Sequence, residues 1–174
     1  MVKLDKIYTR TGDKGKTRLA TGEPVDKWNP RVTAYGSVDE VNAALGVAAT
    51  TAEGDLAEAI HRIQNDLFDL GADLCTPEDG NRSEGALRME ASQVSRLEAE
   101  IDAMNGDLEP LKSFILPGGT ELAARLHLAR TAARTCERSM CLLRETEPVS
   151  DAAMHWMNRC SDLLFAMARA ANRL

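Results

Sequence analysis

The sequence lacks long apolar runs and has few aromatic residues. No apolar stretch approaches the roughly 20 residues that a membrane-spanning helix needs. The N-terminal residues contain neither the apolar core of a secretion signal nor an amphipathic transit segment. Aromatic residues make up 4% of the chain and strand patterns are nearly absent, so helices must supply most of the fold. We therefore expect a helical protein of the cytoplasm that contacts no membrane.

Excess positive charge and paired cysteines are also lacking. The net charge is −6, with 21 basic and 27 acidic residues, which argues against a general nucleic-acid binder. The cysteines form no C-x-x-C pair, so neither a zinc site nor a disulfide framework is indicated. We expect them to be small core residues in a reducing compartment. They are Cys75, Cys136, Cys141 and Cys160.

Apolar residues recur every three or four positions and predict five helices in a single domain. The first helix follows a capping box at Ser37 to Glu40, with Ser37 as the N-cap. The predicted helices cover residues 37–50, 55–75, 90–104, 121–146 and 151–171. The expected fold class is therefore all-α, a five-helix bundle with the up-down arrangement of ferritin-like proteins. We expect residues 1–36 to form an irregular N-terminal arm and residues 37–174 to form the bundle.

The arm contains the stretch TRTGDKGKT, residues 9–17, which ends like a phosphate-binding P-loop. The P-loop pattern needs a glycine at position 10, where this chain has Arg10, and it needs a buried strand before it. Three threonines, two glycines and four cationic side chains within ten residues nevertheless suit a phosphate. A solvated, charged arm explains the same composition, so both interpretations stay open here.

The predicted helix 121–146 carries a row of charged side chains. Arg130, Arg134 and Glu137 stand at i, i+4 and i+7 on one face, with His127 a turn earlier and Arg138 beside them. A solvated face with a helical ion pair explains this pattern. Two arginines and no lysine instead favour planar, bidentate contacts to carboxylate or phosphate.

Two further patterns matter for the choice of function. Asn158, Asp162, Phe165 and Arg169 lie along one side of the last predicted helix. Glu58-x-x-His61 is half of a di-iron motif, but no second copy exists, so we expect no metal there. The residues alone leave two non-enzymatic alternatives open, a helical adaptor without chemistry and a regulatory bundle that senses ATP. Alanine-rich helix faces bury little area each, which favours a homo-oligomer.

Five blocks in order resemble the PduO-type ATP:corrinoid adenosyltransferase family and span nearly the whole chain. They are IYTRTGDKG, RVTAYGSVDEVNAALG, SFILPGGT, LHLARTAARTCERS and MNRCSDLLFAMAR. The resemblance implies a bundle that assembles as a homotrimer with active sites between subunits. It also implies transfer of the 5′-deoxyadenosyl group of ATP to the cobalt of reduced cobalamin, with triphosphate leaving.

The resemblance also implies the residues of an ATP site. The arm would wrap the triphosphate, with Mg²⁺ on the phosphates, and the bundle would complete the site. The ATP-binding residues would be Thr9, Arg10, Thr11, Gly12, Gly15, Thr17, Arg18, Lys27, Arg134, Glu137, Arg138 and Asn158.

The catalytic and corrinoid-binding residues follow from the same resemblance. Asp39 would hold Arg134 across the subunit boundary, with Arg130 next to the pair. Phe114 and Phe165 would face the corrinoid, and Phe114 belongs with Asp39, Arg130 and Arg134 to the catalytic set. A reductase and an adenosylcobalamin-dependent acceptor enzyme are the further partners implied, and no ligands of a resident metal are assigned.

Overall fold

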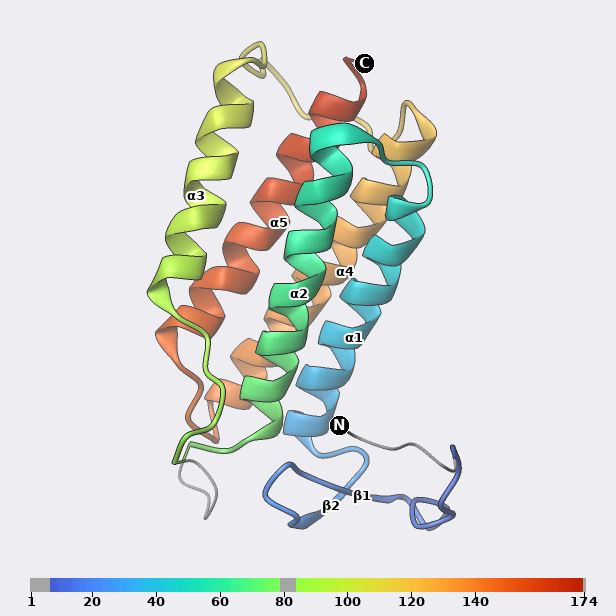
Figure 1. The fold of residues 1–174 in the computed structure, drawn as a ribbon, viewed down its shortest axis with the longest axis vertical. Coiled ribbons are helices and arrows are strands. Elements are labelled where there is room, and N and C mark those ends of the chain that lie inside the picture. Colours follow the sequence, from blue (N-terminus) through green and yellow to red (C-terminus); the bar gives the residue numbers. More distant parts are fainter. Residues whose placement is uncertain (1–6, 79–83, 174) are drawn as a thin grey trace.

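Amphipathic segments form five helices that lie side by side within residues 7–78 and 84–173, the part that this computed structural model describes (Figure 1). They are α1 (Pro30–Ala49), α2 (Gly54–Cys75), α3 (Ala91–Gly106), α4 (Glu121–Arg144) and α5 (Asp151–Ala171). Successive helices run in opposite directions (Figure 1). The predicted all-α five-helix bundle is therefore confirmed. Residues 1–6 of the predicted arm, residues 79–83 of the connection after α2, and residue 174 lie outside the described part.

The start of α1 differs from the prediction. The capping box at Ser37 is wrong, because Asn29 caps the helix by accepting a hydrogen bond from the Arg31 N–H at 2.8 Å. Pro30 occupies the first helical position, where its missing N–H costs nothing. Ser37 lies inside the helix, and its hydroxyl donates to the Thr33 carbonyl at 2.9 Å. Residues 30–36, which we expected in the arm, are thus helical.

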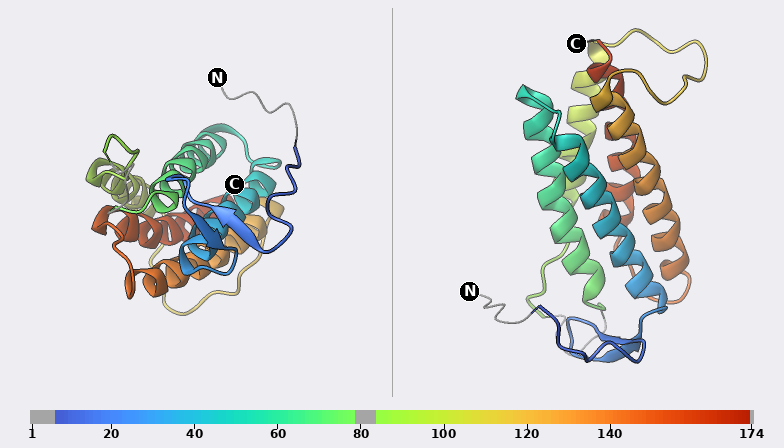
Figure 2. Two further views of the ribbon diagram at one scale, coloured as in Figure 1. Left: turned by 90° about the horizontal axis from the view of Figure 1, so that it is seen from below. Right: turned by 90° about the vertical axis from the view of Figure 1, so that its right-hand side faces the viewer.

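The arm contains a short hairpin that its polar sequence did not predict. β1 (Lys16–Arg18) pairs antiparallel with β2 (Pro24–Asp26). Leu19, which follows β1, is buried, and the Ala20 N–H donates to the Cys75 carbonyl at 3.1 Å. These contacts fasten the hairpin to the end of α2, so the arm lies across the end of the bundle where α1 begins (Figures 1 and 2).

α4 packs between α1 and α5, whereas α2 packs on α1 and α3 on α5. The largest fully buried side chain is Trp156, whose indole Nε1 donates to the buried Asp66 carboxylate at 3.0 Å. Cys136 and Cys160 are buried as expected, but the expectation is wrong for Cys141, which is exposed. In the described residues, no helix is both long and apolar enough to cross a membrane.

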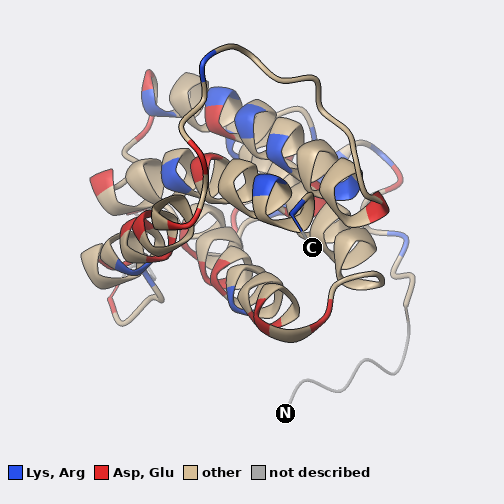
Figure 3. Cartoon of the chain, turned by 90° about the horizontal axis from the view of Figure 1, so that it is seen from above, with Lys and Arg blue, Asp and Glu red and all other residues tan. Residues whose placement is uncertain are grey.

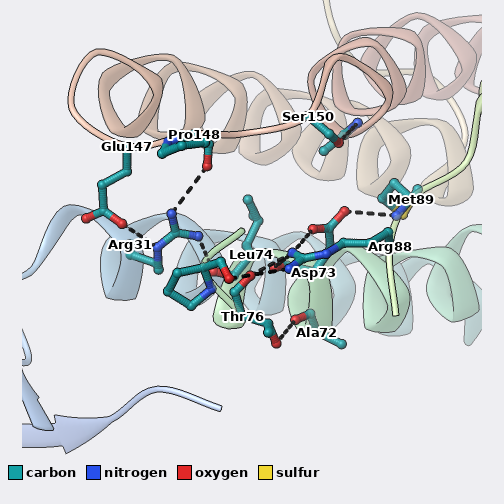
Figure 4. Close-up of polar contacts among 12 residues, drawn as sticks. Arg31, Ala72, Asp73, Leu74, Thr76, Arg88, Met89, Glu147, Pro148 and Ser150 are labelled. Carbon is teal, nitrogen blue, oxygen red and sulfur yellow. Dashed lines mark hydrogen bonds and ion pairs between the residues drawn. The ribbon is translucent and has the colours of Figure 1, made fainter. Parts of the chain in front are cut away.

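A buried guanidinium joins three segments beneath the arm. Arg31 is 2% exposed, and its Nε donates to the Glu147 carboxylate at 2.7 Å. Its Nη atoms donate to the carbonyls of Leu74 and Pro148 at 2.8 and 3.3 Å (Figure 4). A second network around Asp73 lies beside it. Because a buried charge is costly unless paired, these contacts fix the end of α2 against the connection between α4 and α5.

Candidate functional site

One face of α4 carries a row of cationic side chains. The helix contains five arginines and two glutamates on a chain of net charge −6. Figure 3 shows this basic row (blue) on the helix beneath the loop from α3 to α4. Arg130, Arg134, Glu137 and Arg138 share one face, and at 1.5 Å per residue they extend over about 12 Å. The row suits an extended anion.

The side chains in this row differ in what they already bind. Glu137 accepts a hydrogen bond from Asn158 Nδ2 at 2.7 Å, which joins α4 to α5. Arg138 donates to the Arg134 carbonyl at 3.0 Å. Arg134 itself is exposed, and across residues 7–78 and 84–173 its guanidinium has no hydrogen bond or ion pair. Its charge is therefore available to a ligand.

Arg134 also influences the pKa of Asp162 on α5. Burial raises the pKa of the Asp162 carboxyl, and Glu137 raises it further. Arg159 and Arg134 act in the opposite direction and lower that pKa. Arg134 therefore lies near enough to α5 to influence the charge of Asp162.

Asp39, the predicted partner of these arginines, is exposed on α1. Within the chain it forms no ion pair with Arg130 or Arg134, both of which are part of the described structure. The expected pair joins two subunits, and a single chain does not test it. The role of Asp39 therefore stays a prediction.

A cavity of about 510 Å³ opens beside the N-terminal half of α4. It brings together the two aromatic residues expected at the corrinoid with the first arginine of the row. Phe114 is fully exposed, and the Arg130 guanidinium lies over the Phe165 ring, 5.9 Å from its centroid. The lining residues are Leu111, Ser113, Phe114, Ile115, Pro117, His127, Arg130 and Phe165.

His127 belongs to this cavity, although the sequence gave it no role. It is 3% exposed, and its Nδ1 accepts a hydrogen bond from Arg130 Nε at 3.3 Å. A guanidinium only donates, so the ring proton must be on Nε2, which has no partner among the residues described. Burial, and after it the charge of Arg130, lowers the pKa of His127. The ring is therefore neutral near pH 7, and its spacing of three residues from Arg130 was the signal for this contact.

The arm brings several predicted phosphate-binding groups together. The Gly15 N–H donates to the Gly12 carbonyl at 3.2 Å, and the Lys27 N–H donates to the Gly15 carbonyl at 2.9 Å. A Cβ on Gly12 would come within 3.0 Å of the Lys27 ammonium. Gly15 has φ of 74°, a conformation that favours glycine. Thr17 contacts Tyr35, whose pKa is raised mainly by burial. The absence of a side chain at Gly12 thus lets the lysine approach the loop backbone.

The remaining arm residues are arranged less tightly. The hydroxyls of Thr9 and Thr11 lie 2.8 Å apart on an exposed stretch. Arg10 is exposed and has φ of 62°, unusual for a residue with a side chain. Arg18 donates to the Gly22 carbonyl at 2.7 Å and so closes its own hairpin.

The arm lies at the end of the bundle where α1 begins, and the loop that joins α3 to α4 lies at the opposite end (Figures 1 and 2). This loop supplies five of the residues that line the cavity. With 24 residues, α4 extends over about 36 Å between these ends. One chain therefore does not bring its own arm to the cavity that contains Phe114. Within the described ranges, no group of three or more His, Cys, Asp or Glu side chains is placed to hold a metal ion.

Relatives match this chain over most of its length. A family model described as "Cobalamin adenosyltransferase" matches residues 7–171. The chain is 46% identical to a corrinoid adenosyltransferase of Mycobacterium tuberculosis, over 98% of this chain and 91% of the relative. It is 41% identical to a corrinoid adenosyltransferase of Bacillus subtilis, over 96% of this chain and 86% of the relative.

Solved structures share the fold. A variant PduO-type ATP:corrinoid adenosyltransferase from Lactobacillus reuteri, complexed with cobalamin and ATP, has a TM-score of 0.91 and 39% identity. That match covers 97% of this chain and 91% of the other. Another variant from the same organism, complexed with ATP, has a TM-score of 0.87 and 38% identity, covering 96% and 94% of the two chains.

Proposed function

Since this chain belongs to the cobalamin adenosyltransferase family, we propose that it transfers the 5′-deoxyadenosyl group of ATP to the cobalt of a reduced corrinoid such as cobalamin. The electron pair on cobalt(I) forms the bond to C5′, and the bond from C5′ to the triphosphate oxygen breaks. Triphosphate leaves with the electrons of that bond. The observation that best supports this proposal is the cavity lined by Phe114, Phe165 and Arg130, the first arginine of the α4 row.

ATP would lie along the arginine row of α4. The guanidinium of Arg134, which has no partner among the described residues, is available to phosphate, and arginine suits bidentate contacts to phosphate oxygens. The Glu137–Asn158 pair would complete the ATP site from α4 and α5. At the other side of the phosphates, the arm would contribute its loop N–H groups and the ammonium of Lys27.

The residues of the cavity suit this reaction because it needs no general base. Cobalt(I) is already a strong nucleophile, so the protein must position C5′, offset the charge of the leaving triphosphate and exclude water. Arg134 would offset the charge of the leaving triphosphate, while Phe114 and Phe165 would cover the corrinoid and exclude water. Phe114 would also favour loss of the lower axial ligand, which makes reduction to cobalt(I) easier. The neutral ring of His127 adds no competing charge to the cavity.

A second copy of the chain would complete the site. The arm and the loop that supplies five of the residues lining the cavity lie at opposite ends of one bundle, so an arm from a neighbouring subunit is the natural source of phosphate contacts. We expect a homotrimer in which Asp39 of one subunit pairs with Arg134 of the next, beside Arg130. Asp39 and Arg134 are both exposed and are therefore available for that pair.

Mg²⁺ would accompany ATP, bound mainly by the phosphates as is usual for this ion. Glu137 is a carboxylate on the same face, and it already holds Asn158. In the cell, a reductase would supply cobalt(I), and an enzyme dependent on adenosylcobalamin would receive the product. We expect this exchange in the cytoplasm.

The test is incubation of the protein with ATP, Mg²⁺ and chemically reduced cobalamin, followed by absorption spectroscopy. Transfer replaces the cobalt(I) spectrum with that of an alkyl-cobalt corrinoid. Binding of ATP without this change would instead make the protein a nucleotide sensor. Absence of ATP binding would leave a helical adaptor.

A further inference from the structure

We propose that Asn172, just after α5, is a positioning residue that sets where Phe114 stands over the cavity. The Phe114 segment is defined as residues 109–119, which join α3 to α4 and include five of the residues lining the cavity. The proposal rests on the proposed function, because it concerns how the corrinoid-binding cavity is shaped. No residue pattern in the sequence predicted this role.

The amide of Asn172 holds the end of the segment by two hydrogen bonds. Its Oδ1 accepts from the Thr120 N–H at 2.8 Å, and its Nδ2 donates to the Gly118 carbonyl at 3.0 Å. The Thr120 hydroxyl adds a bond by donating to the Ala171 carbonyl at 3.1 Å. Because the amide is planar, two bonds from it fix both the position and the direction of the chain that enters α4.

Gly119 is matched to this amide. It has φ of 112°, and a Cβ at this position would come within 2.0 Å of Asn172 Oδ1 and 2.5 Å of Asn172 Cγ. Real Cβ atoms do not approach so closely, so any larger residue would displace the Asn172 side chain. The contact therefore needs glycine on one side and a short amide on the other.

The beginning of the segment is held by the same helix. Arg169 donates to the Glu109 carbonyl. Among the described residues, residues 109–119 form no backbone–backbone hydrogen bond, and Phe114 and Leu116 are more than nine-tenths exposed. The place of Phe114 thus depends on its two anchors, both at the end of α5.

The other aromatic residue that lines the cavity, Phe165, lies on α5 as well. Phe165 precedes Asn172 by seven positions, which is about 10 Å along the helix axis. Anchoring the segment to α5 therefore fixes the separation between Phe114 and Phe165, the two side chains expected to face the corrinoid. Loosening the anchor should weaken corrinoid binding, because the open segment would have to be ordered again on the ligand.

The experiment compares the steady-state kinetics of the wild-type protein with those of its Asn172→Ala variant. Loss of two ordinary hydrogen bonds should raise the KM for reduced cobalamin about tenfold. The KM for ATP should stay within about twofold, because the α4 row is untouched. Asn65→Ala is the matched control, since Asn65 Nδ2 also donates to a backbone carbonyl, that of His61, at 2.8 Å on an exposed face.

Two more variants separate positioning from general stability. Asn172→Asp keeps the acceptor for the Thr120 N–H but loses the donor to the Gly118 carbonyl, so its corrinoid KM should lie between those of the wild type and Asn172→Ala. Gly119→Ala should raise the corrinoid KM by displacing Asn172. Adding Asn172→Ala to it should then cost little more, because the two changes disrupt one contact.

The possible outcomes distinguish the positioning role of Asn172 from the proposed function. A corrinoid KM that is the same for Asn172→Ala and Asn65→Ala overturns the positioning role. So does an equal rise in both KM values together with a lower melting temperature, which is the behaviour of a purely structural residue. A wild type that binds ATP but forms no alkyl-cobalt product overturns the proposed function instead. If Asn172→Ala fails to fold, Asn172→Asp carries the same comparison.

Discussion

Truncation of Phe114 separates folding from function because the side chain is fully exposed. A phenylalanine in a core costs about 3–5 kcal/mol of unfolding free energy when it is cut to alanine. Phe114 has no such packing to lose, so Phe114→Ala should change the unfolding free energy by less than about 0.5 kcal/mol. Its melting temperature should therefore match that of the wild type.

The effect on ligand binding should be large for the same reason. If the corrinoid covers the exposed ring, burial of a phenylalanine contributes about 1.5–3 kcal/mol to binding. Its loss corresponds to a drop in corrinoid affinity of about 10- to 150-fold. ATP binding should be unchanged, because the proposed ATP contacts come from the arm, Arg134 and the Glu137–Asn158 pair and not from Phe114.

The assay measures transfer from two starting states. One mixture contains fully reduced cobalt(I), and the other contains cobalt(II) with a reductant too weak to reduce the free corrinoid. Phe114→Ala should lose much more activity in the second mixture, where displacement of the lower axial ligand must assist reduction. Leu116→Ala is the control, since Leu116 is 92% exposed in the same segment but does not line the cavity. Equal losses in both mixtures, or a Phe114→Ala variant that behaves like Leu116→Ala, would refute this reasoning.

Three more predictions follow from the α4 face and the cavity. Arg134→Ala should lower the transfer rate about a hundredfold, as loss of one contact worth about 3 kcal/mol to a developing charge does, with the fold intact on circular dichroism. The surface variant Arg144→Ala should keep wild-type rates. Asp39→Asn should weaken both transfer and trimerisation. Mixing Asp39→Asn chains with Arg134→Ala chains should restore activity, because some mixed trimers then contain a site with both native residues. A mixture that stays inactive would exclude a shared site. Burial, and after it the charge of Arg130, lowers the pKa of His127 in the folded protein. As the pH falls below about 6.5, the unfolded chain therefore binds a proton at His127 before the folded protein does, and this favours unfolding. Stability measured by denaturant should thus fall from pH 7.5 to 5.5, and less so in His127→Gln.

The helices could be predicted because their apolar spacing is a local property of the sequence. The start of α1 could not be placed by the same means. A serine three residues before a glutamate resembles a capping box, yet inside a helix the Ser37 hydroxyl simply bonds the carbonyl a turn earlier. The true cap is Asn29, followed by Pro30. The hairpin was missed because its strands are three residues long and polar.

The candidate site, like the fold, could be predicted from the sequence only in part. The shared face of Arg130, Arg134 and Glu137 follows from helical geometry alone, so it could be predicted. The placement of Phe114 near Phe165 came from the family resemblance, because no spacing relates a loop residue to a distant helix. The bond from Asn172 to Gly118 joins residues 54 positions apart, and only the folded chain shows it.

The origin of the carbon on cobalt tests the central claim most directly. ATP labelled with ¹³C at C5′ is incubated with the protein, Mg²⁺ and cobalt(I) cobalamin, and the corrinoid and phosphate products are analysed by nuclear magnetic resonance. The account predicts labelled carbon bonded to cobalt, together with one intact triphosphate for each cobalt–carbon bond formed. Labelled carbon that stays in ATP or its hydrolysis products, with cobalt unalkylated, would contradict it.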